Sequence, residues 1–251
     1  AALAELGDAR VRRVATATRG AATARNVGVA ETDGPIIAFT DDDCRVDTTW
    51  LRAFRDVLID ERVGMVFGGV EKGPTDDPTA QAAEFLPTGT ETYESLPPVS
   101  RPWGISASLA IRRRVFDEVG GFDTRLGPGA PINTGGEDSD LFIRVLAAGH
   151  LVAATDATTV THLGFRSGDE AAALYRGYAF ALGAVFAKHL RLWTRPGSEQ
   201  LPRWLAHFGL QTVANTIQGR RPTGAGFSLG LLKGAIAGLR IPVDPSTRRF
   251  A

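Results

Sequence analysis

The stretch IIAFTDDD at residues 36–43 joins a short apolar run to three consecutive aspartates. An unbroken apolar run of this length is typical of a strand that is buried on both faces of a parallel sheet. Carboxylates gathered at the end of such a strand repel one another and are costly to desolvate, and a bound divalent cation removes that cost. Ligands that offer only oxygen suit Mg²⁺ or Mn²⁺. The stretch therefore predicts either a metal-binding strand end or a solvated acidic loop that also caps the next helix.

Sequence patterns on both sides of this stretch alternate between strands and helices. We expect a Val- and Thr-rich strand at 11–18, an Ala-rich helix at 20–31, a helix N-capped by Asp47, and an apolar strand at 63–70. Strands that alternate with helices indicate right-handed crossovers and a doubly wound sheet. Ligands bind beyond the carboxyl ends of the strands in such sheets, which is where the three aspartates lie.

The remaining chain continues this pattern and then changes character. Residues 71–102 contain several prolines and predict a long excursion over the surface. After it we expect strands at 105–111, 151–154 and 158–163 and helices at 112–119, 137–148 and 167–190, the last opened by a capping box of Ser167 and Glu170. From Pro196 onward, apolar helical stretches are punctuated by basic residues. We therefore expect an α/β domain with a mostly parallel, Rossmann-like sheet flanked by helices at 1–195, and a helical, amphipathic extension at 196–251.

Composition excludes several classes of protein. The chain has 251 residues, of which 43% are hydrophobic and 22% charged, so it is neither disordered nor collagen-like. Its 28 basic and 28 acidic residues balance, which argues against non-specific nucleic-acid binding. A single cysteine, Cys44, excludes an internal disulfide framework and reads best as a small buried hydrophobe.

The two ends of the chain give further expectations. It begins at Ala1 and its only methionine is Met65, so we expect a processed, cloned or incomplete chain. No signal-peptide pattern opens it. The uncharged stretch Trp204 to Gly219 is shorter than the roughly 20 apolar residues of a spanning helix. We expect a cytoplasmic protein that works at the inner face of the membrane.

Four motifs follow one another along the chain: RGAATARNVG at 19–28, IIAFTDDD at 36–43, GGFD at 120–123 and GEDSDL at 136–141. Together they resemble the signature of family 2 glycosyltransferases of the GT-A fold, over roughly residues 11–190. The resemblance implies a nucleotide-sugar donor, a metal ion bound by a DxD motif, and hexosyl transfer with inversion. It implies a hydroxyl acceptor on a glycan, a lipid-linked saccharide or a cell-envelope polysaccharide under synthesis. It also implies that a first strand and helix, which family members normally have, are absent from this fragment.

The resemblance assigns donor and metal roles to residues of the acidic stretch and its neighbours. It places Asp41 and Asp43 near the metal, Mn²⁺ or Mg²⁺, and the ribose. Asp42 is an alternative to them, because three consecutive aspartates can be aligned with the DxD motif in more than one way. Arg25 resembles an arginine that contacts the nucleotide; the alternative is an exposed helix residue. His162 stands where a histidine completes the metal shell in many GT-A enzymes, and neutral imidazole is a credible ligand. The alternative is an ordinary hydrogen-bonded strand histidine.

The acids Glu137 and Asp138 open a helix, where they are either catalytic groups or partners of the helix dipole. Asp138 precedes Leu141 and Phe142 of the expected buried face by three and four residues, so it should point inward. Glu137 should then lie more to the side. A general base must reach the acceptor hydroxyl, and by resemblance Asp138 matches the catalytic base of the family.

Two further features have open interpretations. Trp103 precedes a strand on the acceptor side, where its ring either stacks on a sugar or anchors packing. Arg166 either reaches a phosphate or caps a helix. The extension at 196–251 either lies on a membrane surface near a lipid-linked acceptor, or packs on the sheet domain or on a second subunit.

The sequence therefore predicts an inverting, metal-dependent glycosyltransferase. One rival is a nucleotidyltransferase, which also grips a nucleotide and a metal on an α/β sheet, but the chain has no Gly-rich phosphate loop that bears Lys or Arg. The other rival is a non-catalytic or inactive sugar- or nucleotide-binding module. The intact acids at 41–43 and 138 argue against a degenerate enzyme.

Overall fold

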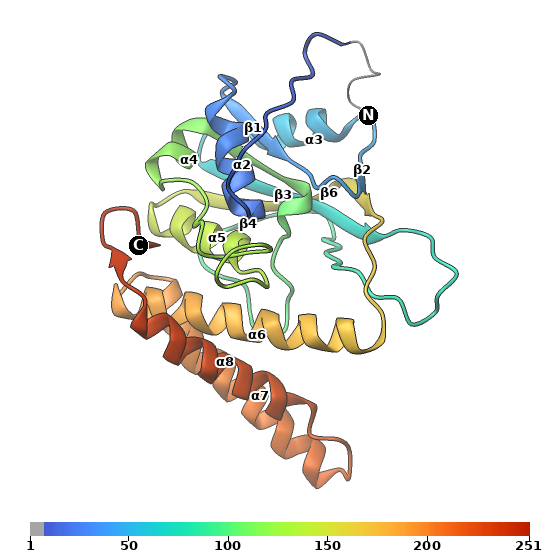
Figure 1. Cartoon of the computed structure of the whole chain (residues 1–251), viewed down its shortest axis with the longest axis vertical. Helices are drawn as coiled ribbons and strands as arrows, with labels where there is room; N and C mark the ends of the chain where they lie inside the picture. The colour runs from blue at the N-terminus through green and yellow to red at the C-terminus, as the bar shows by residue number, and fades with distance from the viewer. Residues whose placement is uncertain (1–7) are drawn as a thin grey trace.

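The computed structural model describes residues 8–251 and has α/β architecture (Figure 1). The strands are β1 Ile36–Phe39, β2 Cys44–Arg45, β3 Val63–Lys72, β4 Thr90–Tyr93, β5 Leu109–Arg112, β6 Leu151–His162, β7 Val243–Asp244 and β8 Arg249–Phe250. The α-helices are α2 Ala21–Ala30, α3 Trp50–Val57, α4 Arg113–Glu118, α5 Glu137–Ala147, α6 Gly168–Arg191, α7 Gln200–Ile217 and α8 Thr223–Arg240, and two 3₁₀ turns are η1 Ser106–Ser108 and η2 Gly197–Glu199. The expected α/β class and the helical C-terminal region are both confirmed.

The expected mostly parallel sheet is wrong. The main sheet has the order β1-β5-β3-β6-β2, with β4 also paired to β6, and of these pairings only β3 with β6 is parallel. The connection from β3 to β5, through residues 73–108, contains no crossover α-helix, so β5 returns antiparallel between β1 and β3. β1, β3 and β6 nevertheless run in one direction, and their carboxyl ends therefore share one side of the sheet.

The expected strand at 11–18 is also absent. These residues form no strand and are exposed. Val11 and Val14 are three positions apart, so they would point to opposite faces of a strand and could not bury one apolar face. β1 is consequently an edge strand of the described sheet, and only its Ile37 and Phe39 are buried.

Two local expectations are corrected as well. The segments expected as separate strands at 151–154 and 158–163 form the single strand β6, whose pairing with β3 shifts register between Gly68 and Gly69. The capping box at the start of α6 does not form, because the Ser167 hydroxyl donates instead to Asp77 Oδ2 at 2.6 Å. The helix itself begins where the sequence predicts.

The core lies between the sheet and its helices. Every residue of β3 from Val63 to Val70 is buried, and the expected buried face of α5 (Leu141, Phe142, Val145 and Leu146) is confirmed. A fully buried ionic cluster joins this core to α6. Lys188 Nζ lies 2.7 Å from both Asp123 Oδ2 and Asp140 Oδ1, and Arg144 Nε lies 2.8 Å from Asp140 Oδ2. Burial would raise the pKa of Asp140, but the charges of Arg144 and Lys188 outweigh it and hold that pKa far below its usual value.

The C-terminal helices form a hairpin on the outer side of α6 (Figure 1). α8 lies against α6 so closely that a Cβ added at Gly183 or Gly234 would collide with the carbonyls of Leu231 or Phe180. In the part of the chain that the structure describes, no helix combines the length and apolarity needed to cross a bilayer.

Candidate active site

The acidic stretch and His162 meet because two strands pair next to them. β2 pairs antiparallel with β6, which sets Cys44 opposite His162, and the Leu163 N–H donates to the Asp43 carbonyl at 2.8 Å. The Asp43 carboxylate consequently lies 3.7 Å from Nε2 of His162 (Oδ1 to Nε2). The structure thus brings together two residues to which the family resemblance gives a metal-binding role.

The donor atoms of this pair fit a divalent cation. Asp43, Cys44 and His162 each offer an atom within 4.8 Å of the others. Burial raises the pKa of the Cys44 thiol to about 11, so at neutral pH it is a protonated and weak ligand. The carboxylate and the imidazole remain, a set of oxygen and nitrogen donors that suits Mn²⁺. A Cβ at Gly164 would collide with the Asp43 carboxylate and the His162 ring, so glycine keeps this space open.

The hydrogen bonding of His162 adds one requirement for metal binding. The Gly164 N–H donates to Nδ1 of His162 at 3.1 Å, which leaves the ring proton on Nε2, facing Asp43. A metal ligand must present an unprotonated nitrogen, and its other nitrogen usually donates a hydrogen bond. Binding through Nε2 therefore requires the proton to leave that nitrogen and the Gly164 contact to rearrange.

Arg25 connects the acidic stretch to the first turn of α5. Its Nη2 lies 2.6 Å from Asp41 Oδ1, and its Nη1 lies 3.0 Å from Glu137 Oε1. The guanidinium also lies over the Phe122 ring, 5.5 Å from its centroid, and the side chain is only 12% exposed. Burial disfavours the charge, but the two carboxylates outweigh it and raise the pKa of Arg25. The alternative of an exposed helix residue is therefore wrong.

Glu137 lies deeper than the sequence predicts. Its side chain is 6% exposed, and its Oε2 is buried without a hydrogen-bond partner among the described residues. The helix begins after Gly136, which has a left-handed φ of 89°, and a Cβ at Gly127 would collide with the Glu137 carboxylate. The glycine-rich loop at 127–136 thus closes over the first turn of α5, a contact that helical spacing cannot reveal.

Asp138 is half-buried, so the expectation that it is the more inward of the two acids is wrong. Its Oδ1 accepts the Ser139 N–H at 2.7 Å. Burial, and then the negative charge of Glu137, raise the pKa of Asp138 to about 7. The same two acids, together with burial, raise the pKa of Tyr178 in α6 to about 12, which keeps its phenol neutral beside them. A carboxylate with a pKa near neutrality suits a general base.

The remaining predicted residues differ in their exposure and contacts. Asp42 is exposed, and Asp41 is engaged by Arg25. The Trp103 ring contacts Phe142 and Trp204, each at 5.8 Å between centroids, and these contacts favour the packing interpretation. Arg166 is exposed, and its Nη1 donates to the carbonyl of Phe165 at 2.8 Å.

Sequence reasoning missed several residues that shape the site. The Phe122 ring lies under the Arg25 guanidinium. Gly127 and Gly164 have no side chain that would collide with the carboxylates of Glu137 and Asp43. Tyr178 reaches the site from α6. Phe122 belongs to the GGFD motif at 120–123, which could have pointed to it. Tyr178 belongs to none of the four motifs, so nothing in the sequence indicated its position.

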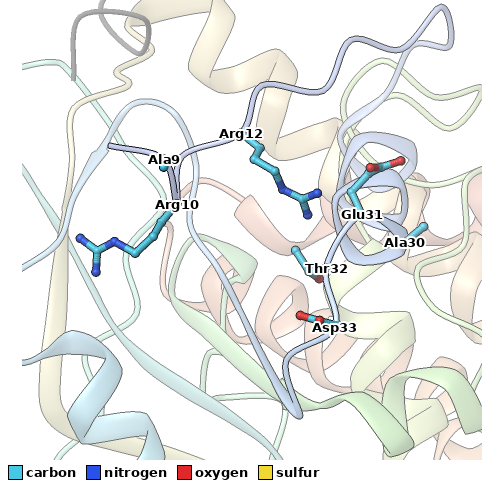
Figure 2. A pocket seen from close by; sticks show the side chains of 7 residues that line it. All are labelled: Ala9, Arg10, Arg12, Ala30, Glu31, Thr32 and Asp33. Carbon is cyan, nitrogen blue, oxygen red and sulfur yellow. The ribbon is translucent and has the colours of Figure 1, made fainter. Parts of the chain in front are cut away.

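A shallow pocket lies elsewhere, at the beginning of β1 rather than beyond its end (Figure 2). Figure 2 shows the Arg12 guanidinium turned toward the loop that bears Thr32, while Arg10 points away. The pocket contains none of the predicted site residues; it is lined by Ala9, Arg10, Arg12, Ala30, Glu31, Thr32 and Asp33.

Comparisons with known proteins agree with the motifs. Residues 1–120 match the model of the family described as glycosyl transferase family 2. Glycosyltransferase AglE of Haloferax volcanii is 29% identical over 115 residues, which are 46% of this chain and 37% of AglE. The chain thus spans little more than a third of this curated relative.

Solved structures give distant likenesses. TarS 1–349 of S. aureus, in complex with UDP-GlcNAc, has 12% identity and a TM-score of 0.46, covering 91% of this chain and 72% of that one. GalNAc-T7 with UDP, GalNAc and Mn²⁺ has 17% identity and a TM-score of 0.41, covering 68% and 37%. The sequence match is the stronger finding. Residues 1–120, a little under half of the chain, are thus similar to glycosyl transferase family 2.

Proposed function

We propose that the chain is an inverting, metal-dependent glycosyltransferase that moves a sugar from a nucleotide-sugar donor to a hydroxyl acceptor. The observation that carries the proposal is the ionic chain from Asp41 through Arg25 to Glu137, next to Asp138. It joins the acidic end of β1 to a carboxylate whose pKa of about 7 suits proton transfer. The match of residues 1–120 to the glycosyl transferase family 2 model supports the same reaction class.

The donor would lie beyond the end of β1, against Arg25, Asp41 and Asp42. Arg25 is held in place by two carboxylates and by the Phe122 ring, so its direction is fixed before a donor binds. A fixed guanidinium can pair with a phosphate without losing side-chain entropy at that step. The carboxylate of Asp41 or Asp42 would accept from ribose hydroxyls.

Asp43 and His162 would hold the metal, Mn²⁺ or Mg²⁺. Asp41 also follows β1, two residues before Asp43, where Arg25 engages it. When bound, such a cation neutralises the negative charge that develops on a departing diphosphate. Gly164 leaves the space between the two ligands open.

Asp138 would take the proton of the acceptor hydroxyl. The hydroxyl oxygen then forms a bond to the anomeric carbon, and the bond from that carbon to the diphosphate breaks on the opposite face. The electron pair of the broken bond leaves with the nucleoside diphosphate, and attack from the opposite face inverts the anomeric centre. Glu137 tunes Asp138, because its negative charge raises the pKa of that neighbour. The acceptor we propose is a saccharide, either a free glycan, a lipid-linked sugar or a cell-envelope polysaccharide.

A donor screen tests this function. The purified chain is incubated with UDP-, GDP- and dTDP-sugars in Mn²⁺ or Mg²⁺, and released nucleotide is separated by chromatography. We expect release of a nucleoside diphosphate from one donor class in the wild type and its loss in Asp138→Asn, whereas Glu118→Gln, an exposed acid of α4, serves as the control. Release of a nucleoside monophosphate with a sugar 1-phosphate would instead indicate cleavage between the two phosphates, as expected of a nucleotidyltransferase. No turnover of any donor would contradict the proposal.

A further inference from the structure

The α7–α8 hairpin leaves apolar side chains exposed on both of its helices. On α7, Leu210, Val213 and Ile217 are 70%, 56% and 81% exposed, and their spacing of three and four residues places them on one face. On α8, a second exposed stripe has the same spacing and consists of Leu229, Leu232, Ile236 and Leu239. We call these two sets the hairpin stripes. Figure 1 shows the hairpin projecting away from the sheet.

All charged residues of the hairpin are basic, although basic and acidic residues balance in the whole chain. Residues 200–240 contain no Asp or Glu, and all five of their basic residues are exposed: Arg203, Arg220, Arg221, Lys233 and Arg240. Arg220 and Arg221 lie at the turn between the helices, directly after the α7 stripe, and Lys233 lies within the α8 stripe. Exposed apolar stripes with basic residues and no acids are the pattern of a helix that lies at a membrane surface.

We propose that this hairpin docks the protein on the surface of an anionic lipid bilayer. The hairpin stripes enter the boundary between headgroups and acyl chains, and the five cations contact acidic headgroups. A second copy of the chain is a poorer occupant, because a symmetric contact would set five cations against five without an acid between them. The hairpin lies on the bilayer without crossing it, which agrees with the absence of a spanning helix in the described part of the chain.

The packing of the hairpin relates this surface to the candidate active site. The turn-proximal half of α8 lies against the first half of α6, where the Phe227 and Tyr175 rings are 5.2 Å apart between centroids. The same half of α6 contacts the loop before α5, since Thr134 Oγ1 donates to the Gly177 carbonyl at 2.8 Å. The basic turn therefore lies toward the end of α6 that borders the site. On the function proposed above, docking would favour acceptors that are carried by lipids.

Vesicle co-sedimentation tests the docking. The purified chain is mixed with vesicles of phosphatidylcholine alone, or of phosphatidylcholine with about one third phosphatidylglycerol, at low and high salt. We expect at least tenfold tighter binding to the anionic vesicles, because the hairpin cations attract acidic headgroups, and loss of that difference at high salt, because salt screens the attraction. Arg220→Glu/Arg221→Glu and the triple variant Leu210→Ser/Val213→Ser/Ile217→Ser should each bind at least tenfold more weakly.

Matched controls replace exposed residues away from the hairpin. Arg12→Glu/Arg13→Glu reverses another exposed pair of adjacent arginines, and Ile59→Ser removes an apolar side chain that is 74% exposed. Both should bind vesicles within twofold of the wild type, and all variants should keep the wild-type melting temperature. Equal binding to neutral and anionic vesicles, or equal losses in the controls, would overturn the proposal.

Other results would distinguish a failure of the docking proposal from a failure of the proposed transferase function. A dimer that the triple Ser variant dissociates, in the absence of vesicle binding, would assign the hairpin stripes to a second copy and overturn membrane docking. The donor screen uses no lipid, so a chain that turns over a donor but ignores vesicles would contradict the docking alone. A chain that binds anionic vesicles but turns over no donor would contradict the transferase alone.

Discussion

Replacing Glu137 by glutamine removes a negative charge from beside Asp138 while keeping the shape of the side chain. Burial and then Glu137 are the two largest causes that raise the pKa of Asp138 from 3.8 to about 7. If Asp138 is the base, kcat/KM of the wild type rises about tenfold per pH unit below pH 7 and levels off above it. In Glu137→Gln this acid limb should move to lower pH, because a lost like charge makes the carboxylate easier to ionise.

The expected movement of the acid limb depends on how much Glu137 contributes to the raised pKa of Asp138. Burial is a larger cause of the raised Asp138 pKa than Glu137 is, so most of the rise should remain in the variant. We therefore expect the limb to move by about one unit, which corresponds to about 1.4 kcal/mol. Arg25 acts in the same direction, since it loses its bond to Glu137 and its positive charge already lowers the Asp138 pKa.

The assay measures initial rates of nucleotide release over a pH range from about 3 to about 9 at low donor concentration. The control is Glu118→Gln, in which the charge removed lies on α4, outside the site, and the limb should stay in place. A limb at the wild-type pH in Glu137→Gln would refute the coupling between the two acids. A wild-type limb near pH 4 would refute Asp138 as a base with a raised pKa.

Four further variants test other parts of the site. Asp138→Asn should lower turnover by about 10²- to 10⁴-fold while donor binding, measured by calorimetry, stays nearly intact; near-normal turnover would exclude it as the base. His162→Ala should raise the Mn²⁺ concentration needed for half-maximal rate, and an unchanged metal titration would return it to an ordinary strand histidine. Arg25→Met should weaken donor binding and reduce stability by about 3–5 kcal/mol, because it leaves Asp41 and Glu137 without their cation, and urea unfolding measures this loss. Lys188→Met should cost a similar amount without a primary effect on donor binding; wild-type stability in that variant would contradict the buried ionic cluster.

Local patterns predicted the elements that carry the site. The IIAFTDDD stretch is a strand that ends in acids, and α5 buries the face that its apolar spacing indicates. Both features depend on residues that are close in sequence, which is why spacing reveals them.

The contacts that organise the site come from distant parts of the chain. Arg25 and Glu137 are 112 positions apart, and Lys188 and Asp123 are 65 positions apart. The direction of β5 depends on a long excursion that returns without a helical crossover, so the alternation of elements suggested a parallel sheet incorrectly. The depth of Glu137 depends in turn on glycines of the preceding loop, whose left-handed conformations let it close over the helix.

The most direct test of the proposed site is the position of manganese in a crystal of the chain grown with Mn²⁺ and the nucleoside diphosphate that the donor screen identifies. Anomalous scattering at the manganese edge locates the ion without assumptions about the ligands. We predict one peak at coordination distance from the Asp43 carboxylate and the His162 imidazole, with the nucleotide beside Arg25 and Asp41. A peak away from both ligands, with the nucleotide bound elsewhere on the chain, would contradict the account.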